Sequence, residues 1–268
     1  MILKRTTELL FGKYGDELQL LTIDAVVAGI YFTGVKLSDG SGGVAYTNVG
    51  SSECSTHLRS KGFGEFTPGN FCGRKVIDIF AVTDPDAFVK TVQLATLNAL
   101  SARFISGPPY KIIEGADPIS QINLVPETKV CIIGAFLSYI KKVTDAGCNL
   151  SIIERNEAVV PAEYRSKYVL PQHQNAAVAN AEILIITGAT LSNNTLQHFL
   201  TLASPETKVI LVGPTASILP DVLFSEGVTI LGATRITNVD KMLVLVAEGA
   251  SGFHLFNYCA TKYCVINE

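Results

Sequence analysis

The sequence has no long hydrophobic run and no marked excess of charge of one sign. Both absences bear on whether it is a membrane protein or a nucleic-acid-binding protein. Its most apolar stretches, such as 183–186 and 209–212, are strand-length, far short of the roughly 20 residues that cross a bilayer. The N-terminal residues are interrupted by charges and lack the continuous apolar core of a signal peptide, so we expect no secretory signal here. With 24 acidic against 21 basic residues and no block of one sign, nothing indicates nucleic acid or membrane as a partner. We therefore expect a cytoplasmic protein with a small-molecule ligand.

Familiar catalytic and metal-binding motifs are also missing. There is no Ser-His-Asp order, nucleophile elbow or Walker sequence. The six cysteines are scattered, which fits reduced thiols. Two groups of residues, Cys54 with His57 and His254 with Cys259 and Cys264, have ligand types but not the paired spacing of structural zinc. We interpret them as ordinary loop and tail residues, and the metal ligands, if any, stay unknown.

What is present is a large apolar content, 48% hydrophobic against 17% charged residues, which is enough to build one large core or two modest ones. The first half reads as strands followed by helices. A helix is expected over 2–14, two strands within 19–37, a hairpin turn at 39–43, a loop over 54–74 and a helix over 85–105 starting with Pro85 after Asp84.

A different pattern begins after Pro126, where short continuous apolar runs alternate with helical spacing. Such runs are typical of parallel strands buried on both faces, with helices as crossovers. The sequence therefore predicts an α/β fold in which a small α+β domain, residues 1–110, precedes a Rossmann-like doubly wound parallel sheet, residues 111–268. The linker is expected within 107–125. The runs that carry this prediction are KVCIIGA, NLSIIER, EILIITGAT, KVILVGPT and VTILGA.

Polar and glycine residues follow several of these strands, where open parallel sheets bind their ligands. Gly134 follows the first strand, but it is only one of the three glycines of a dinucleotide fingerprint. Glu154 follows the next strand at the spacing of a ribose-binding acid. The segments 187–195 and 213–217 are strand ends rich in hydroxyls and amides. Helix capping alone could also explain their polar residues.

Two positions in the first half also stand out. Asn98 has apolar neighbours on nearly every helical face, so its amide needs a partner, either in a neighbouring loop or at a domain interface. Ser41, Gly42 and Gly43 form either a plain tight turn or an anion-holding nest of N–H groups.

The strings KVCIIGAF, SIIERN, EILIITGATLSNNTL, VILVGPTAS and the closing AEG resemble a known family, named "putative heavy-metal chelation". The resemblance covers nearly the whole chain, and TGATLSNNT and GPTAS are its most specific parts. It implies an enolase-N-terminal-like β-β-β-α unit in the first half, a Rossmann-like second domain and a site in a cleft between the two. The chain departs from the family's pattern at Asn156, Glu157 and Thr215.

Carried over by the resemblance, the site comprises thirteen residues. Two would carry chemistry and the others would bind the ligand. The catalytic pair is Glu154 and Arg155, and the binding residues are Asn98, Gly43, Gly134, Phe136, Thr187, Gly188, Thr190, Asn194, Gly213, Pro214 and Thr215.

Three functions stay open at this stage, and the sequence does not decide whether the protein is an enzyme. The leading hypothesis is binding, with or without processing, of a small polar or anionic metal-chelating molecule, linked to metal homeostasis; a transition metal or a metal chelate would be the cofactor. The first alternative is a nucleotide-dependent enzyme using NAD or S-adenosylmethionine. The second is a non-catalytic metal carrier using Cys54, His57 or the C-terminal cysteines. A symmetric homodimer is the oligomer that base rates favour.

Overall fold

The computed structural model describes residues 2–48, 66–106 and 109–267, and these form two compact units. Unit 1 comprises Met1–Ser106, Ser217–Leu219 and Thr234–Thr261, and unit 2 comprises Gly107–Ala216, Pro220–Ala233 and Lys262–Glu268. The chain therefore passes between the units more than once. The division into independent domains at residue 110 stays a prediction.

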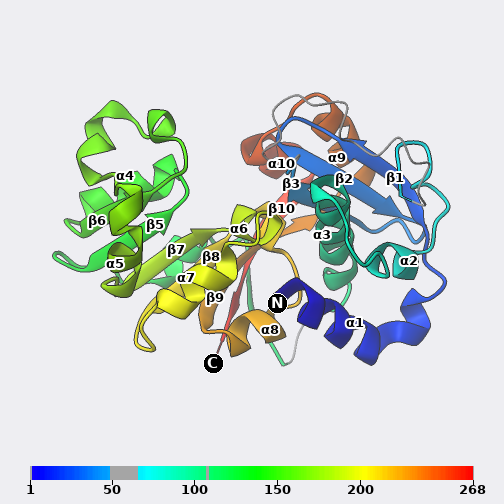
Figure 1. Cartoon of the computed structure of the whole chain (residues 1–268), viewed down its shortest axis with the longest axis horizontal. Helices are drawn as coiled ribbons and strands as arrows, with labels where there is room; N and C mark the ends of the chain where they lie inside the picture. Colours follow the sequence, from blue (N-terminus) through cyan, green and yellow to red (C-terminus); the bar gives the residue numbers. More distant parts are fainter. Residues whose placement is uncertain (1, 49–65, 107–108, 268) are drawn as a thin grey trace. The chain divides into compact units, whose positions relative to one another are not determined.

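Unit 1 is built on a three-stranded antiparallel sheet in the order β1-β2-β3 (Figure 1). The hairpin predicted at 39–43 joins β2 to β3, and Gly40 takes the left-handed conformation that such turns require, with φ of 83°. The elements of the first half have these bounds: α1 (Ile2–Leu18), β1 (Ile23–Ala28), β2 (Phe32–Leu37), β3 (Gly42–Tyr46), α2 (Val76–Phe80) and α3 (Ala87–Ser101).

The helix α3 begins later than the proline pattern predicted. Its N-cap is Asp86, whose carboxylate accepts a hydrogen bond of 2.8 Å from the backbone N–H of Val89, so Asp84 and Pro85 lie outside the helix. The helix packs on β2 and β3, and almost all of its residues from Val89 to Ser101 are buried.

Two later helices, α9 (Val239–Ala247) and α10 (Gly252–Tyr258), also belong to unit 1. Met242, Leu245 and Val246 of α9 form a buried cluster with Phe32 and Val44 of the sheet. A methyl group added at Gly34 would lie 2.6 Å from the sulfur of Met242, so the helix approaches β2 closely. These contacts explain why the C-terminal segment joins the N-terminal sheet.

Unit 2 contains most of a seven-stranded sheet in the order β4-β10-β9-β8-β7-β5-β6, with neighbouring strands from β9 to β6 parallel. The α/β prediction is confirmed. The sequence pattern missed β4 and β10, and β4 lies in the segment that we expected to be a linker. The strands are β4 (Lys111–Glu114), β5 (Lys129–Ile133), β6 (Asn149–Ile153), β7 (Ile183–Thr187), β8 (Lys208–Val212), β9 (Val228–Ile236) and β10 (Ala260–Ile266).

The direction of β10 follows from two backbone hydrogen bonds. The N–H of Thr237 donates to the carbonyl of Cys259, and the N–H of Asn267 donates to the carbonyl of Thr229. Because the later residue of one strand meets the earlier residue of the other, β10 runs antiparallel to β9. The start of β10 therefore lies at the carboxyl edge of the parallel strands, which is the edge where the site was predicted.

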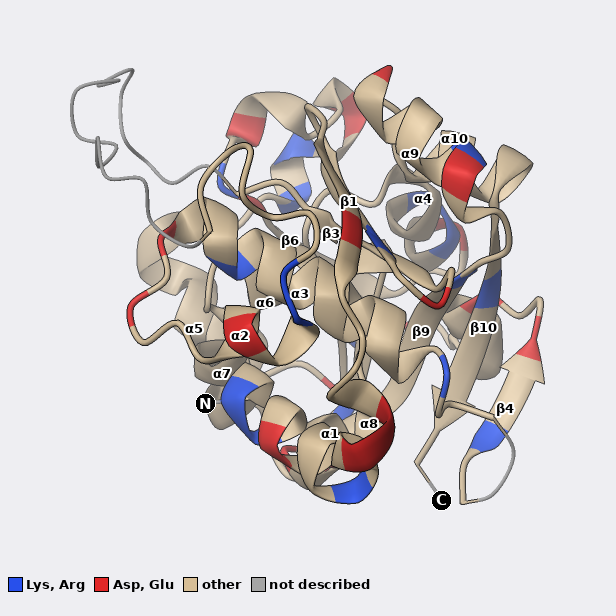
Figure 2. Cartoon of the chain, turned by 90° about the vertical axis from the view of Figure 1, so that its right-hand side faces the viewer, with Lys and Arg blue, Asp and Glu red and all other residues tan. Residues whose placement is uncertain are grey.

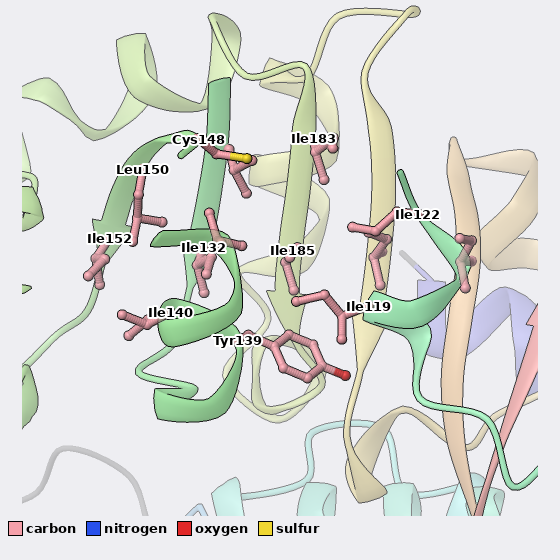
Figure 3. Close-up of a cluster of buried hydrophobic side chains, with 14 of the residues drawn as sticks. Ile119, Ile122, Ile132, Tyr139, Ile140, Cys148, Leu150, Ile152, Ile183 and Ile185 are labelled. Atoms are coloured by element: carbon pink, nitrogen blue, oxygen red, sulfur yellow. The ribbon is translucent and has the colours of Figure 1, made fainter. Parts of the chain in front are cut away.

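The parallel strands are buried on both faces, as their continuous apolar runs predicted. On one face, Ile132 of β5 and Ile185 of β7 pack with Ile140 and Tyr139 of α4 (Figure 3). The alternate residues Cys131 and Leu184 are equally buried on the other face. The helices of unit 2 are α4 (Leu137–Asp145), α5 (Gln174–Ala179), α6 (Ala189–Ser192), α7 (Leu196–Leu202) and α8 (Pro220–Ser225).

Charged residues of both signs are interspersed along α1 (Figure 2), where Lys4 and Glu8 form an ion pair one turn apart at 3.8 Å. Within the described part of the chain, no helix combines the length and the apolar character that spanning a membrane requires.

Candidate functional site

The predicted site centres on the point in the parallel sheet where the order of the strands along the chain reverses. From β5 the chain crosses to β6 on one side, whereas from β7 it crosses to β8 on the other. In open α/β sheets the crevice at such a switch point, beyond the carboxyl ends of the strands, is where ligands bind. Here it lies between β5 and β7. Gly134 follows β5 with φ of 105°, and a methyl group added there would lie 3.1 Å from the side chain of Thr187. The two strand-end turns thus contact each other.

Glu154 connects the turns that follow β5 and β6. Its carboxylate accepts hydrogen bonds from the backbone N–H groups of Ala135 at 3.1 Å, Arg155 at 2.7 Å and Asn156 at 3.3 Å. Charge-assisted bonds of this kind are stronger than neutral ones, so Glu154 positions both turns. The role of Glu154 as a catalytic base stays a prediction. In the structure its carboxylate also holds the turns after β5 and β6 together.

Arg155 differs from its neighbour because its side chain is exposed. Among the residues that the structure describes, no carboxylate pairs with its guanidinium. An exposed guanidinium can bind a carboxylate or a phosphate through two parallel hydrogen bonds.

The hydroxyl groups after β7 serve the local backbone. The Oγ1 atom of Thr187 accepts a bond of 3.3 Å from the N–H of Ala189, and the buried Thr190 hydroxyl donates to the carbonyl of Thr187 at 2.6 Å. They help to close the short helix α6, which forms within the segment 187–195 that we interpreted as a polar strand end. Both side chains therefore bond to the local backbone, and their role in ligand binding stays a prediction.

The turns after β7 and β8 pack closely. A methyl group added at Gly188 would lie 2.8 Å from the backbone nitrogen of Ala216, and Gly213 has φ of 122°. Thr215 is buried in a short 3₁₀ helix that starts at Pro214. The switch point and these two turns thus place Gly134, Thr187, Gly188 and Gly213 at one edge of unit 2.

Asn194 is exposed and left-handed, with φ of 59°. The amide of the preceding residue holds the turn before α7, because Asn193 Oδ1 accepts bonds from the N–H and the hydroxyl of Thr195, at 3.2 and 2.6 Å. Phe136, the N-cap residue of α4, packs its ring 5.5 Å from that of Tyr139.

The two candidate residues of unit 1 have packing roles. Asn98 is buried and donates a hydrogen bond of 2.7 Å to the carbonyl of Val44. Gly43 lies in β3 rather than in the turn, and a methyl group added there would lie 2.3 Å from the carbonyl oxygen of Ala95. The close approach of β3 to α3 therefore requires glycine at this position.

Sequence reasoning missed a cluster of titratable side chains at the same edge of unit 2. Asp117, just after β4, accepts hydrogen bonds from the hydroxyl of Tyr139 and, at 2.9 Å, from the ammonium of Lys262. Burial alone would raise the pKa of Asp117, but the bonds from Tyr139 and Lys262 outweigh it and lower that pKa. Burial, followed by the bond to Asp117, raises the pKa of Tyr139. The phenol therefore stays a neutral hydrogen-bond donor.

No sequence motif could have identified this cluster, because its members are separated by up to 145 residues. Lys262 lies at the start of β10, a strand that the sequence did not predict, and Tyr139 fits the apolar pattern of α4. Its ring lies beside Ile119 and Ile185 in the core (Figure 3).

The candidate metal ligands do not converge among the described residues. Cys54 and His57 lie outside them. Cys259 and Cys264 are buried, and burial raises the pKa of Cys264 to about 11. The Nδ1 atom of His254 bonds with Ser251 at the start of α10. In residues 2–48, 66–106 and 109–267, no three His, Cys, Asp or Glu side chains are grouped closely enough to hold an ion.

A groove of about 390 Å³ lies at the opposite, amino edge of β5 and β6. Lys129, Asn149, Lys167 and His173 contribute to its walls. None of the thirteen candidate residues lines it.

Comparison with known proteins finds two family models that share one description, each matching a different half of the chain. A family model described as "Putative heavy-metal chelation" matches residues 117–265, and a second model with that description matches residues 12–101. An uncharacterized protein of Methanocaldococcus jannaschii is 40% identical over 82 residues, which is 31% of this chain and 31% of that protein. The matched segment thus spans about a third of that relative.

Two crystal structures of proteins of unknown function share the fold. One, from Pyrococcus horikoshii, superposes with a TM-score of 0.77 at 20% identity, over 100% of both chains. The other, from Desulfitobacterium hafniense, has a TM-score of 0.70 at 19% identity, over 97% of this chain and 100% of the other. At these identities the likeness concerns the fold.

Proposed function

Because the chain belongs to the family described as "Putative heavy-metal chelation", we propose that it binds a small anionic metal-chelating molecule at the carboxyl ends of β5, β7 and β8. The observation that carries this proposal is the exposed side chain of Arg155 in the turn after β6, which Glu154 joins to the turn after β5 at the switch point. In the proposed site, Arg155 binds a carboxylate or phosphate of the ligand, and Glu154 holds the turns that bear it.

The described residues favour a chelate over a bare metal ion as the ligand. They offer no set of three acidic, histidine or cysteine donors, whereas a chelating molecule brings its own donor atoms. The role that we propose for the described residues at these strand ends is recognition of the organic part of such a chelate.

Replacing Arg155 with alanine is expected to weaken binding of a Ni²⁺–citrate complex by about tenfold or more, because one charge-assisted contact is worth about 1.5–3 kcal/mol. The melting temperature should stay unchanged, since the side chain is exposed. Isothermal titration calorimetry and thermal unfolding measure the two quantities.

The matched control is Lys142→Ala. Lys142 is also exposed but lies in the last turn of α4, which runs back toward the amino edge of the sheet. Equal affinity losses in both variants would indicate general electrostatics and contradict the assignment of Arg155. Native mass spectrometry of the purified protein, with elemental analysis of the same sample, would identify a ligand that co-purifies.

The nucleotide alternative retains one supporting observation, since dinucleotide-binding sheets use the same kind of switch point. It predicts that NAD, NADP, S-adenosylmethionine or ATP at a hundred times its dissociation constant stabilises the fold by about 2.7 kcal/mol. A thermal-shift series measures this. We expect no shift, because the backbone N–H groups already engage the Glu154 carboxylate that a ribose would need.

A further inference from the structure

The groove of about 390 Å³ at the amino edge of β5 and β6 is built by unit 2 alone. The strand register pairs Cys131 of β5 with Ser151 of β6, and both residues line the groove. The side chains of Val130 and Leu150 point the other way, into the core cluster that contains Ile140 of α4. The groove therefore lies on the face of the sheet opposite α4. The five-residue strands separate it from the switch point by about 16 Å.

The floor and the helical wall of the groove are apolar. Cys131 is buried, and burial raises the pKa of its thiol to about 12, so this side chain stays neutral. The helical wall comes from α5 and the residues just after it, which contribute Ala176, Ala177 and Ala181. We call these three residues the alanine wall. Because each has only a methyl group as its side chain, they leave room beside the sheet for the apolar body of a small molecule.

The rim of the groove has two ammonium groups, those of Lys129 and Lys167. Within the described part of the chain, neither forms an ion pair or a hydrogen bond. Two carboxylates near the groove have other partners. Glu182 accepts a bond of 2.8 Å from the backbone N–H of Lys129, and Glu127 accepts one of 3.0 Å from the side-chain amide of Asn149. Both ammonium groups are therefore available to an anion.

Neutral hydrogen-bonding groups lie beside these lysines. The hydroxyl of Ser151 and the ring of His173 line the groove, and neither bonds to another described residue. The edge of β6 adds backbone groups. The carbonyl of Ile152 accepts a bond of 2.8 Å from Val169, so the backbone groups of Ile152 point away from β5. Because this direction alternates along a strand, those of Leu150 also point to the open edge.

We propose that this groove binds a small molecule that combines an apolar body with a carboxylate or phosphate group. The body lies against Cys131 and the alanine wall, and the ammonium groups of Lys129 and Lys167 bind the oxyanion, with Ser151 and His173 as further donors. This second site lies at the opposite edge of the sheet from the switch point and does not depend on the proposed chelate-binding function.

The test is titration of the full chain with benzoate and separately with phenyl phosphate, followed by the amide NMR chemical shifts. Benzamide, a neutral molecule of nearly the same shape as benzoate, is the control ligand. Both oxyanions should bind about tenfold more tightly than benzamide, and the tighter of the two identifies the class of oxyanion. The largest shift changes should fall within 129–131, 149–151 and 176–181.

Two variants examine the two halves of the ligand. The double variant Lys129→Gln/Lys167→Gln is expected to weaken oxyanion binding by about tenfold or more. Its matched control is Lys141→Gln/Lys142→Gln, which removes the same charge from α4 on the other face and should leave affinity unchanged. Ala176→Leu fills the groove at an exposed position and should weaken binding of all three ligands without lowering the melting temperature.

Four results would each overturn the proposal: no binding of either oxyanion, equal affinity for benzamide, an equal loss in the α4 double variant, or unchanged binding in Ala176→Leu. Arg155→Ala should leave this binding intact. If Arg155→Ala abolished it and the shift changes clustered around residue 134, the oxyanion would bind at the switch point. That outcome overturns the second site and leaves the proposed function standing.

Discussion

Replacement of Gly43 by alanine is expected to lower the free energy of unfolding by about 3 kcal/mol or more, at the upper end of overpacking effects. The added methyl group would lie 2.3 Å from the carbonyl oxygen of Ala95 and 2.5 Å from the backbone nitrogen of Ala99. Both atoms belong to the backbone of α3, so the collision cannot be relieved by a change of rotamer. The helix must move away from β3, which separates buried apolar surface. Thermal and denaturant unfolding measure the loss.

The matched control is Gly12→Ala in α1, where no atom lies within 4 Å of the added methyl group. This change should stabilise the protein by about 0.5–1 kcal/mol, since glycine is a poor helix residue. Gly43→Ala also separates two roles for a candidate site residue. If the variant stayed as stable as the wild type but lost ligand affinity, position 43 would be a binding position, and our packing explanation would be wrong.

Asp117→Asn is expected to lower the free energy of unfolding at neutral pH by about 2 kcal/mol. The amide can still accept a bond from Tyr139, but Lys262 loses its carboxylate partner. We place the loss below that of a fully buried pair because the side chain of Lys262 is 42% exposed. Tyr139→Phe, which removes only the hydroxyl, completes a double-mutant cycle with Asp117→Asn. A coupling near zero would contradict a cooperative cluster.

The same variant should change the dependence of stability on pH. The folded-state pKa of Asp117 lies below its ordinary value of 3.8, so between the two pKa values the unfolded chain binds more protons than the folded one. The stabilisation by Asp117 is therefore present above about pH 4 and is lost as the pH falls through the lowered pKa. The wild type and Asp117→Asn should converge in stability at acidic pH.

Denaturant unfolding at several pH values would show this convergence. Asp145→Asn is the control, because Asp145 is an exposed residue at the end of α4 and its replacement changes the net charge equally. A stability gap between Asp117→Asn and the wild type that stayed constant down to pH values well below 3.8 would argue against the ion-paired carboxylate.

The family and the α/β architecture could be predicted from the sequence because both depend on short-range patterns. Five continuous apolar runs correspond to the parallel strands β5 to β9, and the turn residues at 39–43 correspond to the hairpin before β3. The glycines after β5 and β8 occupy left-handed conformations that other residues avoid. Each of these signals lies within a few residues of the structure that it determines.

Other features had no local signal. The strand β4 has only four residues, and β10 contains Cys264, which we interpreted as an ordinary tail residue. Residues 189–192 form α6 although their composition is typical of a loop. In each case, pairing or packing with distant segments outweighed the local preference.

What the sequence determined by itself, then, is which segments are strands with buried faces and which residues follow them, since burial imposes periodicity and turns impose glycine. Only the tertiary structure decided which of those residues meet. In the tertiary structure, Glu154 accepts hydrogen bonds from three backbone N–H groups, and Gly43 packs against the backbone of α3. Asp117 accepts hydrogen bonds from Tyr139 and Lys262. The physical reason is that hydrogen bonds and steric contacts depend on distances in space, and these distances follow from the order of the strands in the sheet.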